Sequence, residues 1–195
     1  MPDHSTRPLT KNNAENTGRT VRVFFAIWPD NAAREQMAGL AKQLRLASLC
    51  NGREIKAENI HLTLAFVGEI EPSRVEALRM VADGTRDAGA RAFDFTVEEV
   101  RYWKHNHIVY AAPISAPQEL LDLVNALSER LAAAGFSLEQ RAYAPHITLM
   151  RNASCQSAPE LPKPVAWRVR EWRLIKSEQT SGGSVYTPIG RWPLI

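Results

Sequence analysis

The chain of 195 residues is 45% hydrophobic and 23% charged, values typical of a folded protein with a buried core, which excludes a largely disordered or fibrous chain. The formal net charge is +3 and the sequence pI is about 9.0, so anionic partners are favoured. No apolar run approaches the ~18 residues that a membrane-spanning helix requires, and the polar N-terminus lacks the apolar core of a signal peptide. We therefore expect a cytoplasmic protein without a membrane partner.

The basic residues are mostly arginine, with 18 Arg against 6 Lys. Arginine presents a planar fork of donors that matches phosphate oxygens, so this excess fits a phosphate-rich ligand. A bias toward GC-rich codons explains the same excess. Composition alone leaves both interpretations open.

Two cysteines, Cys50 and Cys155, are the only ones in the chain. They are too few and too far apart in sequence to indicate a disulfide framework or a zinc knuckle. We expect both to be incidental thiols in a reducing compartment.

The first half of the chain alternates strands and helices after a polar leader. Residues 1–20, rich in Asn, Thr and Pro, predict a disordered leader, in which His4 is given no role. Asp30 or Asn31 can cap the first helix, and Pro72 opens the second. The expected elements are a strand at 21–28, a helix at 32–47, a loop at 50–59 with a short strand at 54–56, a strand at 60–68 and a helix from 72.

The second half begins with a hairpin. Alternating apolar residues predict a strand at 93–102, which returns through a tip at 104–107, and His105 and His107 in that tip are expected to be exposed and without a role. A helix follows, opened by Pro117 and ended by Gly135. The remaining expected strands are a second His-Thr strand at 146–150, one at 166–177 and one at 184–194, the last two joined by a Gly182-Gly183 turn.

One short phrase occurs twice, as His61-Leu62-Thr63-Leu64 and as His146-Ile147-Thr148-Leu149. Random placement of the chain's His and Thr residues gives only roughly 0.26 His-x-Thr triplets, so chance is a poor explanation. Each phrase lies in an apolar, β-branched run that predicts a strand. On a strand the His and the Thr two residues later share one face, while the apolar partners face a core.

In both halves of the chain the predicted order of elements is therefore a strand, a helix and a His-Thr strand. This pattern predicts an α+β protein whose residues 21–195 form a single domain of two related lobes, with antiparallel sheets as the walls of a central groove. If the two phrases face one another across that groove, two imidazoles and two hydroxyls converge on one point.

The sequence resembles a known family, the two-histidine phosphoesterase superfamily, and within it the bacterial and archaeal RNA 2′,3′-cyclic phosphodiesterases, also called 2′-5′ RNA ligases. The resemblance covers about residues 21–193, and its motifs are specific as a set although either tetrapeptide alone would be weak. The matching stretches are Arg22 to Ile27, Asn59 to Glu69, Ala144 to Arg151, Tyr186-Thr187-Pro188 and Arg191-Trp192.

The resemblance implies a bilobal fold with a pseudo-twofold axis through the cleft and one motif on each lobe. It also implies hydrolysis of a 2′,3′-cyclic phosphate on RNA to a 2′-phosphate, without a metal or another cofactor. Some members also join RNA ends by a weak, reversible 2′-5′ ligation. The implied partner is RNA with cyclic phosphate ends, such as tRNA halves, or else a small cyclic nucleotide or ADP-ribose cyclic phosphate. We expect the protein to be a monomer.

Two histidines suit this chemistry because opening a cyclic phosphodiester removes a proton on one side of phosphorus and delivers one on the other. The unperturbed histidine pKa of about 6.5 lies near working pH, so one imidazole can be neutral and the other protonated. Thr63 and Thr148 can donate hydrogen bonds to the non-bridging oxygens. By resemblance, His61 is the proton donor to the leaving 3′ oxygen and His146 the acceptor that activates water.

Four further residues are candidates for substrate binding. Arg151 can clamp phosphate or the next nucleotide, or it can be a solvent-facing arginine. Phe24 falls where the family keeps an aromatic at the cleft; it can stack on a base or belong to the core. Tyr110 and Trp103 are weaker candidates.

Two other classes of function compete with this hypothesis. A metal site on the two histidines lacks Asp, Glu or Cys at ligand spacing, so no metal is expected. A non-catalytic RNA-binding module would use the same cleft and arginines, but replacing either histidine would then weaken binding only modestly.

Overall fold

One antiparallel sheet runs through both halves of the chain in this computed structural model, which describes residues 20–47, 49–139, 141–157 and 161–195. Residues 1–19 of the predicted leader lie outside the described residues. The elements are β1 (Val21–Ile27), α1 (Asn31–Leu46), β2 (Cys50–Glu54), the 3₁₀ turn η1 (Ala57–Asn59), β3 (Leu62–Ile70), the 3₁₀ turn η2 (Pro72–Arg74), α2 (Val75–Asp87), β4 (Phe93–Val97), β5 (Glu99–Trp103), β6 (Ile108–Ala112), α3 (Gln118–Ala133), β7 (Ile147–Cys155), β8 (Val165–Val169), β9 (Glu171–Thr180) and β10 (Gly183–Pro193).

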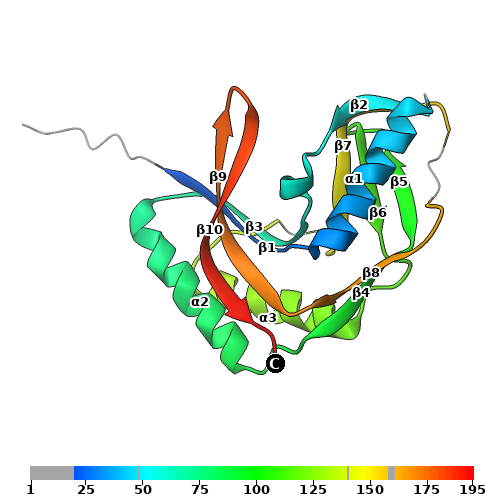
Figure 1. The fold of residues 1–195 in the computed structure, drawn as a ribbon. Helices are drawn as coiled ribbons and strands as arrows, with labels where there is room; N and C mark the ends of the chain where they lie inside the picture. The colour runs from blue at the N-terminus through cyan, green and yellow to red at the C-terminus, as the bar shows by residue number, and fades with distance from the viewer. Residues whose placement is uncertain (1–19, 48, 140, 158–160) are drawn as a thin grey trace, which may run out of the picture.

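The strand order in the large sheet is β10-β9-β1-β3-β7-β6-β5, with β2 added to β7, and β4 and β8 form a separate two-stranded sheet. Strands β10, β9, β1 and β3 make the first lobe, and β7, β6, β5 and β2 make the second (Figure 1). The lobes meet where Leu62 of β3 pairs with Ile147 of β7, the only residue pair in register between these strands. The predicted α+β class and its two antiparallel lobes are confirmed.

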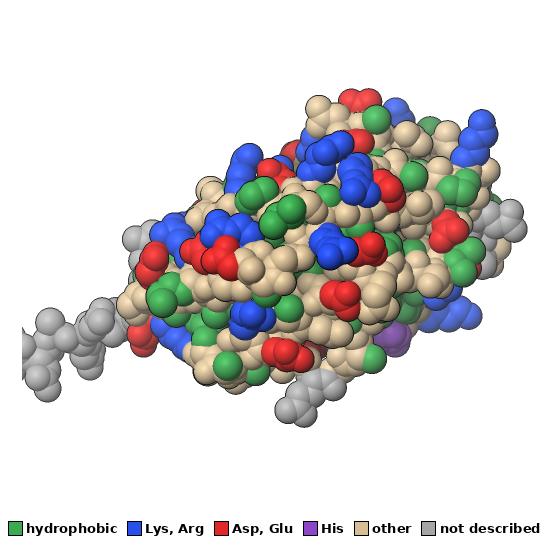
Figure 2. Space-filling model, turned by 90° about the horizontal axis from the view of Figure 1, so that it is seen from below, with side chains coloured by type: hydrophobic (Ala, Val, Ile, Leu, Met, Phe, Trp, Pro, Cys, Tyr) green, Lys and Arg blue, Asp and Glu red, His purple; other side chains and the backbone are tan. Residues whose placement is uncertain are grey.

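The two lobes exchange their helices. Helix α1 follows β1 of the first lobe but packs on β2, β7 and β8, whereas α3 follows β6 of the second lobe and packs on β3 and α2. The units β1-α1-β3 and β6-α3-β7 therefore repeat one another with crossed helices. Figure 2, which views the molecule from below, shows acidic and basic side chains interspersed over that face without a block of one sign.

Local sequence explains the helix boundaries. The Asp30 carboxylate accepts from the Ala33 backbone N–H at 2.8 Å and caps α1, whose buried stripe includes Met37 and Leu40. Beyond α3, Gly135 adopts a φ of +75°, a left-handed conformation that glycine adopts without steric cost. The helices predicted from residue 32, from residue 72 and from Pro117 are all present.

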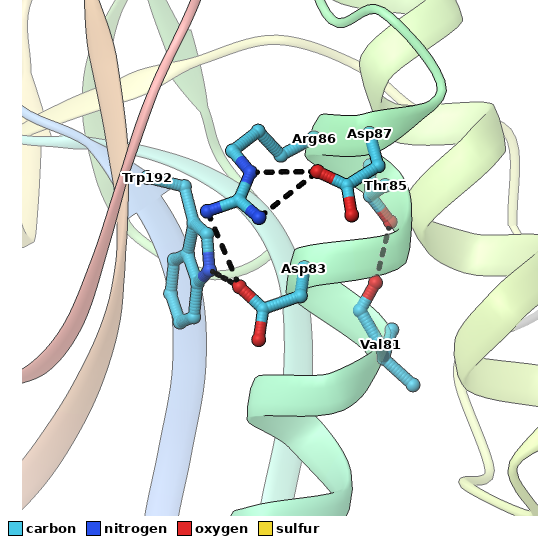
Figure 3. Close-up of polar contacts among 6 residues, drawn as sticks. All are labelled: Val81, Asp83, Thr85, Arg86, Asp87 and Trp192. Carbon is cyan, nitrogen blue, oxygen red and sulfur yellow. Dashed lines mark hydrogen bonds and ion pairs between the residues drawn. The ribbon is translucent and has the colours of Figure 1, made fainter.

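The C-terminal strand is anchored through Trp192. Its indole packs against Trp172 with ring centroids 5.2 Å apart, and its Nε1–H donates to the Asp83 carboxylate at 2.8 Å (Figure 3). The hydrogen bond from Trp192 ties β10 to α2, and Arg86, also in α2, contacts the same carboxylate at 3.5 Å. Thr85, the one buried polar side chain among the described residues, donates to the Val81 carbonyl at 2.9 Å.

Two predicted strands are each divided in the structure. The strand expected at 93–102 is β4, which pairs with β8, followed by β5, which pairs with β6. The strand expected at 166–177 is β8 followed by β9, with the break at Arg170. At each break the alternation of buried residues changes phase, from odd to even positions, because the chain passes from one sheet to the other. The short strand expected at 54–56 is found at 50–54 instead.

The expectation that the two cysteines are incidental thiols is wrong. Cys50 and Cys155 are cross-strand partners in the β2–β7 pair, with Cα atoms 4.1 Å apart, and they form a disulfide with an S–S distance of 2.07 Å. The separation of 105 residues along the chain says nothing about this distance, since antiparallel pairing brings the two ends of a long loop together. No helix of the described chain is long and apolar enough to cross a membrane.

Removal of the disulfide is expected to destabilise the protein. Because the cross-link closes a loop of 105 residues, the chain-entropy model gives a loss of about 3–5 kcal/mol for Cys50→Ala or Cys155→Ala. Thermal or urea unfolding under non-reducing conditions measures this loss. Either substitution removes the same bond, so the double variant should be little less stable than the singles. Two titratable thiols in the unreduced, denatured protein would contradict the disulfide.

Candidate active site

The two His-Thr phrases lie side by side at the junction of the lobes. Leu62 pairs with Ile147, so extending the antiparallel register by one residue in each direction sets His61 opposite Thr148 and His146 opposite Thr63. All four polar side chains are partly exposed, whereas the intervening apolar residues Leu62, Leu64, Ile147 and Leu149 are buried. The predicted division of each phrase into a polar face and a core face is confirmed.

The two imidazoles are held in the same way. Nδ1 of His61 lies 2.6 Å from the carbonyl oxygen of Asn59, and Nδ1 of His146 lies 2.8 Å from that of Ala144, in each case the residue two positions earlier. A carbonyl can only accept, so each Nδ1 carries a proton and donates it. In the neutral ring Nε2 is then the basic nitrogen. Both rings therefore present the nitrogen that can take up or deliver a proton.

Aromatic rings surround His61. Trp28 stacks on the imidazole with centroids 5.0 Å apart and an interplanar angle of 21°, while Phe24 lies at 5.1 Å and Tyr186 at 5.2 Å. The Trp28 Nε1–H donates to the Glu58 carbonyl at 3.0 Å, which fixes the indole. These rings hold the imidazole in place and exclude water from it.

A second aromatic pair borders His146. Trp103 and Tyr110 lie with centroids 4.8 Å and 5.9 Å from the imidazole, and 4.0 Å from one another. Tyr110 belongs to β6, where it pairs with Thr148, so its ring is set directly against the second phrase. Both histidines therefore have aromatic neighbours, three rings around His61 and two around His146.

Burial makes both imidazoles harder to protonate. The pKa of His61 falls to about 4, chiefly because of burial; the positive charges of Arg151 and His146 act in the same direction, and the hydrogen bond to Asn59 opposes them. Burial also lowers the pKa of His146, again assisted by Arg141 and Arg151 and opposed by the hydrogen bond to Ala144. Both rings are therefore neutral at pH 7 in the unliganded protein.

A basic cavity of about 150 Å³ adjoins His61 and Thr148. Arg151 of β7 and Arg53 of β2 line it and are cross-strand partners, so two positive side chains start from directly opposed positions. Lys56 adds a third cation, and the β9–β10 turn with Tyr186 closes the other side. Thr63 and His146 are not among the residues that line this cavity. In the strand register they form the pair next to His61 and Thr148, so they lie beside the cavity.

Two hydrogen bonds brace the junction. The Tyr143 hydroxyl, just before the second phrase, donates to the Thr63 carbonyl of the first at 3.0 Å. The Asn59 side-chain amide donates to the Ser184 carbonyl near the start of β10 at 2.9 Å. Burial raises the pKa of Tyr143, so its hydroxyl keeps the proton that this bond requires. Each phrase is thus tied to an element distant in sequence.

The candidate residues from the sequence have different environments. Arg151 is exposed and also lines the cavity. Phe24 is only 4% exposed and packs against His61, which favours the core alternative over base stacking. Tyr110 is 6% exposed, and Trp103 is partly exposed. As predicted, His105 and His107 are exposed.

Sequence reasoning missed Trp28, Tyr186, Arg53 and Tyr143. A signal existed for Trp28, because strand alternation puts residues 24, 26 and 28 on one face. The other three depend on pairing or loop placement, for which the sequence holds no local sign. Within the described residues no three His, Cys, Asp or Glu side chains gather as metal ligands.

Comparison with known proteins identifies the family of the chain. The model of the LigT like Phosphoesterase family matches residues 27–110 and 112–186. The RNA 2′,3′-cyclic phosphodiesterase of Escherichia coli strain K12 is 35% identical over 176 residues, which cover 89% of this chain and 96% of the relative. A namesake from Methanothermobacter thermautotrophicus is 25% identical over 86% of this chain and 95% of its own length.

Solved structures extend the likeness to the fold. The crystal structure of E. coli LigT complexed with 3′-AMP superimposes with a TM-score of 0.81 at 30% identity, covering 90% of this chain and 99% of that one. The apo form of the same enzyme gives a TM-score of 0.78 over 90% and 98%. Sequence, fold and the paired His-Thr phrases agree, and the chain belongs to the LigT-like phosphoesterase family.

Proposed function

We propose that this chain is an RNA 2′,3′-cyclic phosphodiesterase, which hydrolyses a terminal 2′,3′-cyclic phosphate to a 2′-phosphate by two-histidine acid–base catalysis. The observation that carries the proposal is the pair of imidazoles at the lobe junction, each with Nδ1 bound to a backbone carbonyl and Nε2 left as the reactive nitrogen. The RNA 2′,3′-cyclic phosphodiesterases among its relatives support the choice of substrate.

The reaction places water and the leaving 3′ oxygen on opposite sides of phosphorus. One neutral Nε2 accepts a proton from the attacking water, and the other ring, protonated, donates to the 3′ oxygen as its bond to phosphorus breaks. The 2′ ester remains, so the product is a 2′-phosphate. The directly opposed pairs His61–Thr148 and Thr63–His146 supply a hydroxyl beside each imidazole.

Charge on the non-bridging oxygens grows in the transition state. Thr63 and Thr148 donate hydrogen bonds to these oxygens from stiff, β-branched side chains on two strands. Arg151, with Arg53 opposite it on β2, balances the negative charge of the phosphate. Phe24 supports the His61 ring from beneath rather than stacking on a base.

The roles of the two histidines follow the family: His61 donates the proton and His146 accepts one. His61 has a pKa of about 4 in the unliganded protein, so substrate must raise that pKa before the ring can act as an acid. A bound phosphodiester does so, since its negative charge favours the imidazolium and offsets the charge of Arg151. The Trp28 ring stacked on His61 favours the cation in the same direction.

A related substrate class is the alternative: a small cyclic nucleotide or an ADP-ribose cyclic phosphate. E. coli LigT has been solved in complexes with 3′-AMP, ATP and NADP+, which supports a site that accepts nucleotides. Weak, reversible 2′-5′ ligation of RNA ends would use the same histidines in the same roles, with a 5′-hydroxyl in place of water as the attacking group and the 3′ oxygen again leaving. A monomer is proposed, because all the proposed catalytic groups come from one chain.

A cytoplasmic location is proposed together with the RNA substrate. The disulfide between Cys50 and Cys155 counts against it, because disulfides are rare in cytosolic proteins.

The first test offers RNA with a 2′,3′-cyclic phosphate end in buffer containing a strong chelator. We expect release of the 2′-phosphate, resolved from the 3′-phosphate by chromatography. His61→Ala and His146→Ala should each lower kcat by about 100- to 10,000-fold, because each removes one proton-transfer group. His105→Ala, in the exposed hairpin tip, is the matched control and should keep full activity. A 3′-phosphate product, or histidine variants that retain turnover, would overturn the proposal.

The pH dependence follows from the lowered pKa values. The free enzyme needs one imidazole protonated and one neutral, and both pKa values lie below 6.5, that of His61 at about 4. Raising the pH above the higher value deprotonates both rings, so kcat/KM should fall about tenfold per pH unit there. Below the lower value both rings are protonated and kcat/KM should fall again. An optimum above pH 7 in kcat/KM would contradict these shifts.

A substrate with a good leaving group distinguishes the two roles. In a 3′-deoxynucleoside 2′-(4-nitrophenyl phosphate), the nitrophenolate departs without needing a proton. His61→Ala should therefore hydrolyse this ester at nearly the rate of the unaltered enzyme, whereas His146→Ala, lacking the base, should not. Release of nitrophenolate is followed by absorbance. The reverse pattern would exchange the assignments of donor and acceptor.

A further inference from the structure

A second cavity, of about 760 Å³, lies where the N-terminal end of α1 approaches the β8–β9 corner and β10. Asp30 and Glu171 are the only acidic residues in its lining, so the lining has a net charge of +3, as large as the formal net charge of the whole chain. Positive charge is concentrated here. The five arginines that line it are Arg34, Arg168, Arg170, Arg173 and Arg191.

Arg173 of β9 and Arg191 of β10 are direct cross-strand partners. Like charges at directly opposed positions destabilise a sheet, so the pair carries a cost in the free protein. Glu171 pairs with Arg173, but Arg191 has no ion-pair partner among the described residues. The pair repeats the arrangement of Arg53 and Arg151 in the first cavity, where an anion is expected to bind.

The remaining arginines add donors that the protein leaves unused. Arg170 makes no ion pair within the described part of the chain, and Nε of Arg34 is buried without a hydrogen-bond partner. Arg168 is the exception, since Asp94 holds it at 3.1 Å. Arg170 and Arg191 are both exposed, so their guanidinium donors are accessible to a ligand that supplies acceptors.

Strand register connects this cavity to the active site. Arg191 pairs with Arg173, Arg173 with Ala26 of β1, and Ala26 with Thr63 of β3, so the four residues form one row across the sheet. Directly paired residues share a face, and the row therefore leads along the face that carries Thr63. Because neighbouring strands lie about 4.8 Å apart, the backbone of Arg173 lies about 10 Å, and that of Arg191 about 14 Å, from the backbone of Thr63.

Trp28 spans the distance between the two sites. Its ring stacks on His61, and the guanidinium carbon of Arg173 lies 5.6 Å from the centre of the same ring. Trp28 also lines the second cavity. An aromatic surface flanked by cations is the combination that binds single-stranded nucleic acid, in which bases stack and phosphates meet basic groups.

We propose that the arginine groove, defined by Arg170, Arg173 and Arg191, binds the phosphate backbone of the RNA strand on the 5′ side of the terminal cyclic phosphate. This inference rests on the proposed function. The groove thereby makes the enzyme prefer an oligonucleotide over a mononucleotide with the same 3′ end. An RNA strand fits better than a lone anion because Arg173 and Arg191 form a row leading away from the catalytic histidines, and Arg170 adds a further cation at the β8–β9 break.

The test compares a nucleoside 2′,3′-cyclic phosphate with a hexanucleotide that ends in the same nucleotide. In the double variant Arg170→Gln/Arg191→Gln, the ratio of kcat/KM for the hexanucleotide to that for the mononucleotide should fall about tenfold per arginine, through KM. The slope of log KM against log salt for the hexanucleotide should decrease by about 1.4, since single strands release about 0.7 counterion per phosphate contact. Arg91→Gln, an exposed arginine on the cavity between α2 and α3, is the matched control for loss of charge.

Each other outcome has a definite meaning. An unchanged ratio and salt slope would overturn the groove, as would an equal loss on both substrates, which indicates a site for a single phosphate. A fall in the ratio for Arg91→Gln as large as for the double variant would also overturn it, because overall charge would then explain the effect. Failure of the unaltered enzyme to cleave either substrate would instead contradict the proposed function.

Discussion

The pairing of Leu62 with Ile147 holds the two halves of the site together. It is the only pair in register between β3 and β7, yet it is flanked on one face by His61, Thr63, His146 and Thr148. A joint this short gives little resistance to bending, so the relative position of the imidazoles depends on other ties between the lobes. The exchanged helices α1 and α3 provide them, because each packs on the lobe opposite the strand that it follows. The hydrogen bond from Tyr143 to Thr63 adds a direct tie at the joint.

Much of this arrangement was predictable because it depends on local periodicity. Alternation within each phrase separates the His and Thr from the Leu and Ile, and helical stripes such as Met37 and Leu40 indicate a buried face. A stripe does not specify which sheet covers it, so the exchange of α1 and α3 has no sequence signal. The disulfide and the two arginine pairs likewise depend on register between strands distant in sequence. The divided strands are a different case, since the phase change after Val97 and after Val169 was present in the sequence.

The two histidines are equivalent in backbone geometry and unequal in environment. Three aromatic rings enclose His61, whereas two border His146, and burial is the first cause of the lowered pKa of each. Repetition in the sequence accounts for the shared hydrogen bond to the carbonyl two residues earlier. The difference arises from β1, β10 and β5, whose side chains the repeat does not determine.

Each of the two cavities contains one pair of opposed arginines. Arg53 with Arg151 and Arg173 with Arg191 each bring two positive side chains to directly opposed positions, which costs stability in the free protein. A phosphate between the members of a pair removes that repulsion, so binding contributes more than its own hydrogen bonds. In the first cavity it also offsets the charge of Arg151 on His61, which raises the pKa of the imidazole when the proton is needed. In the proposed mechanism the bound phosphate therefore converts His61 from a neutral ring into an acid, and the unliganded site has no protonated His61 to act as a donor at pH 7.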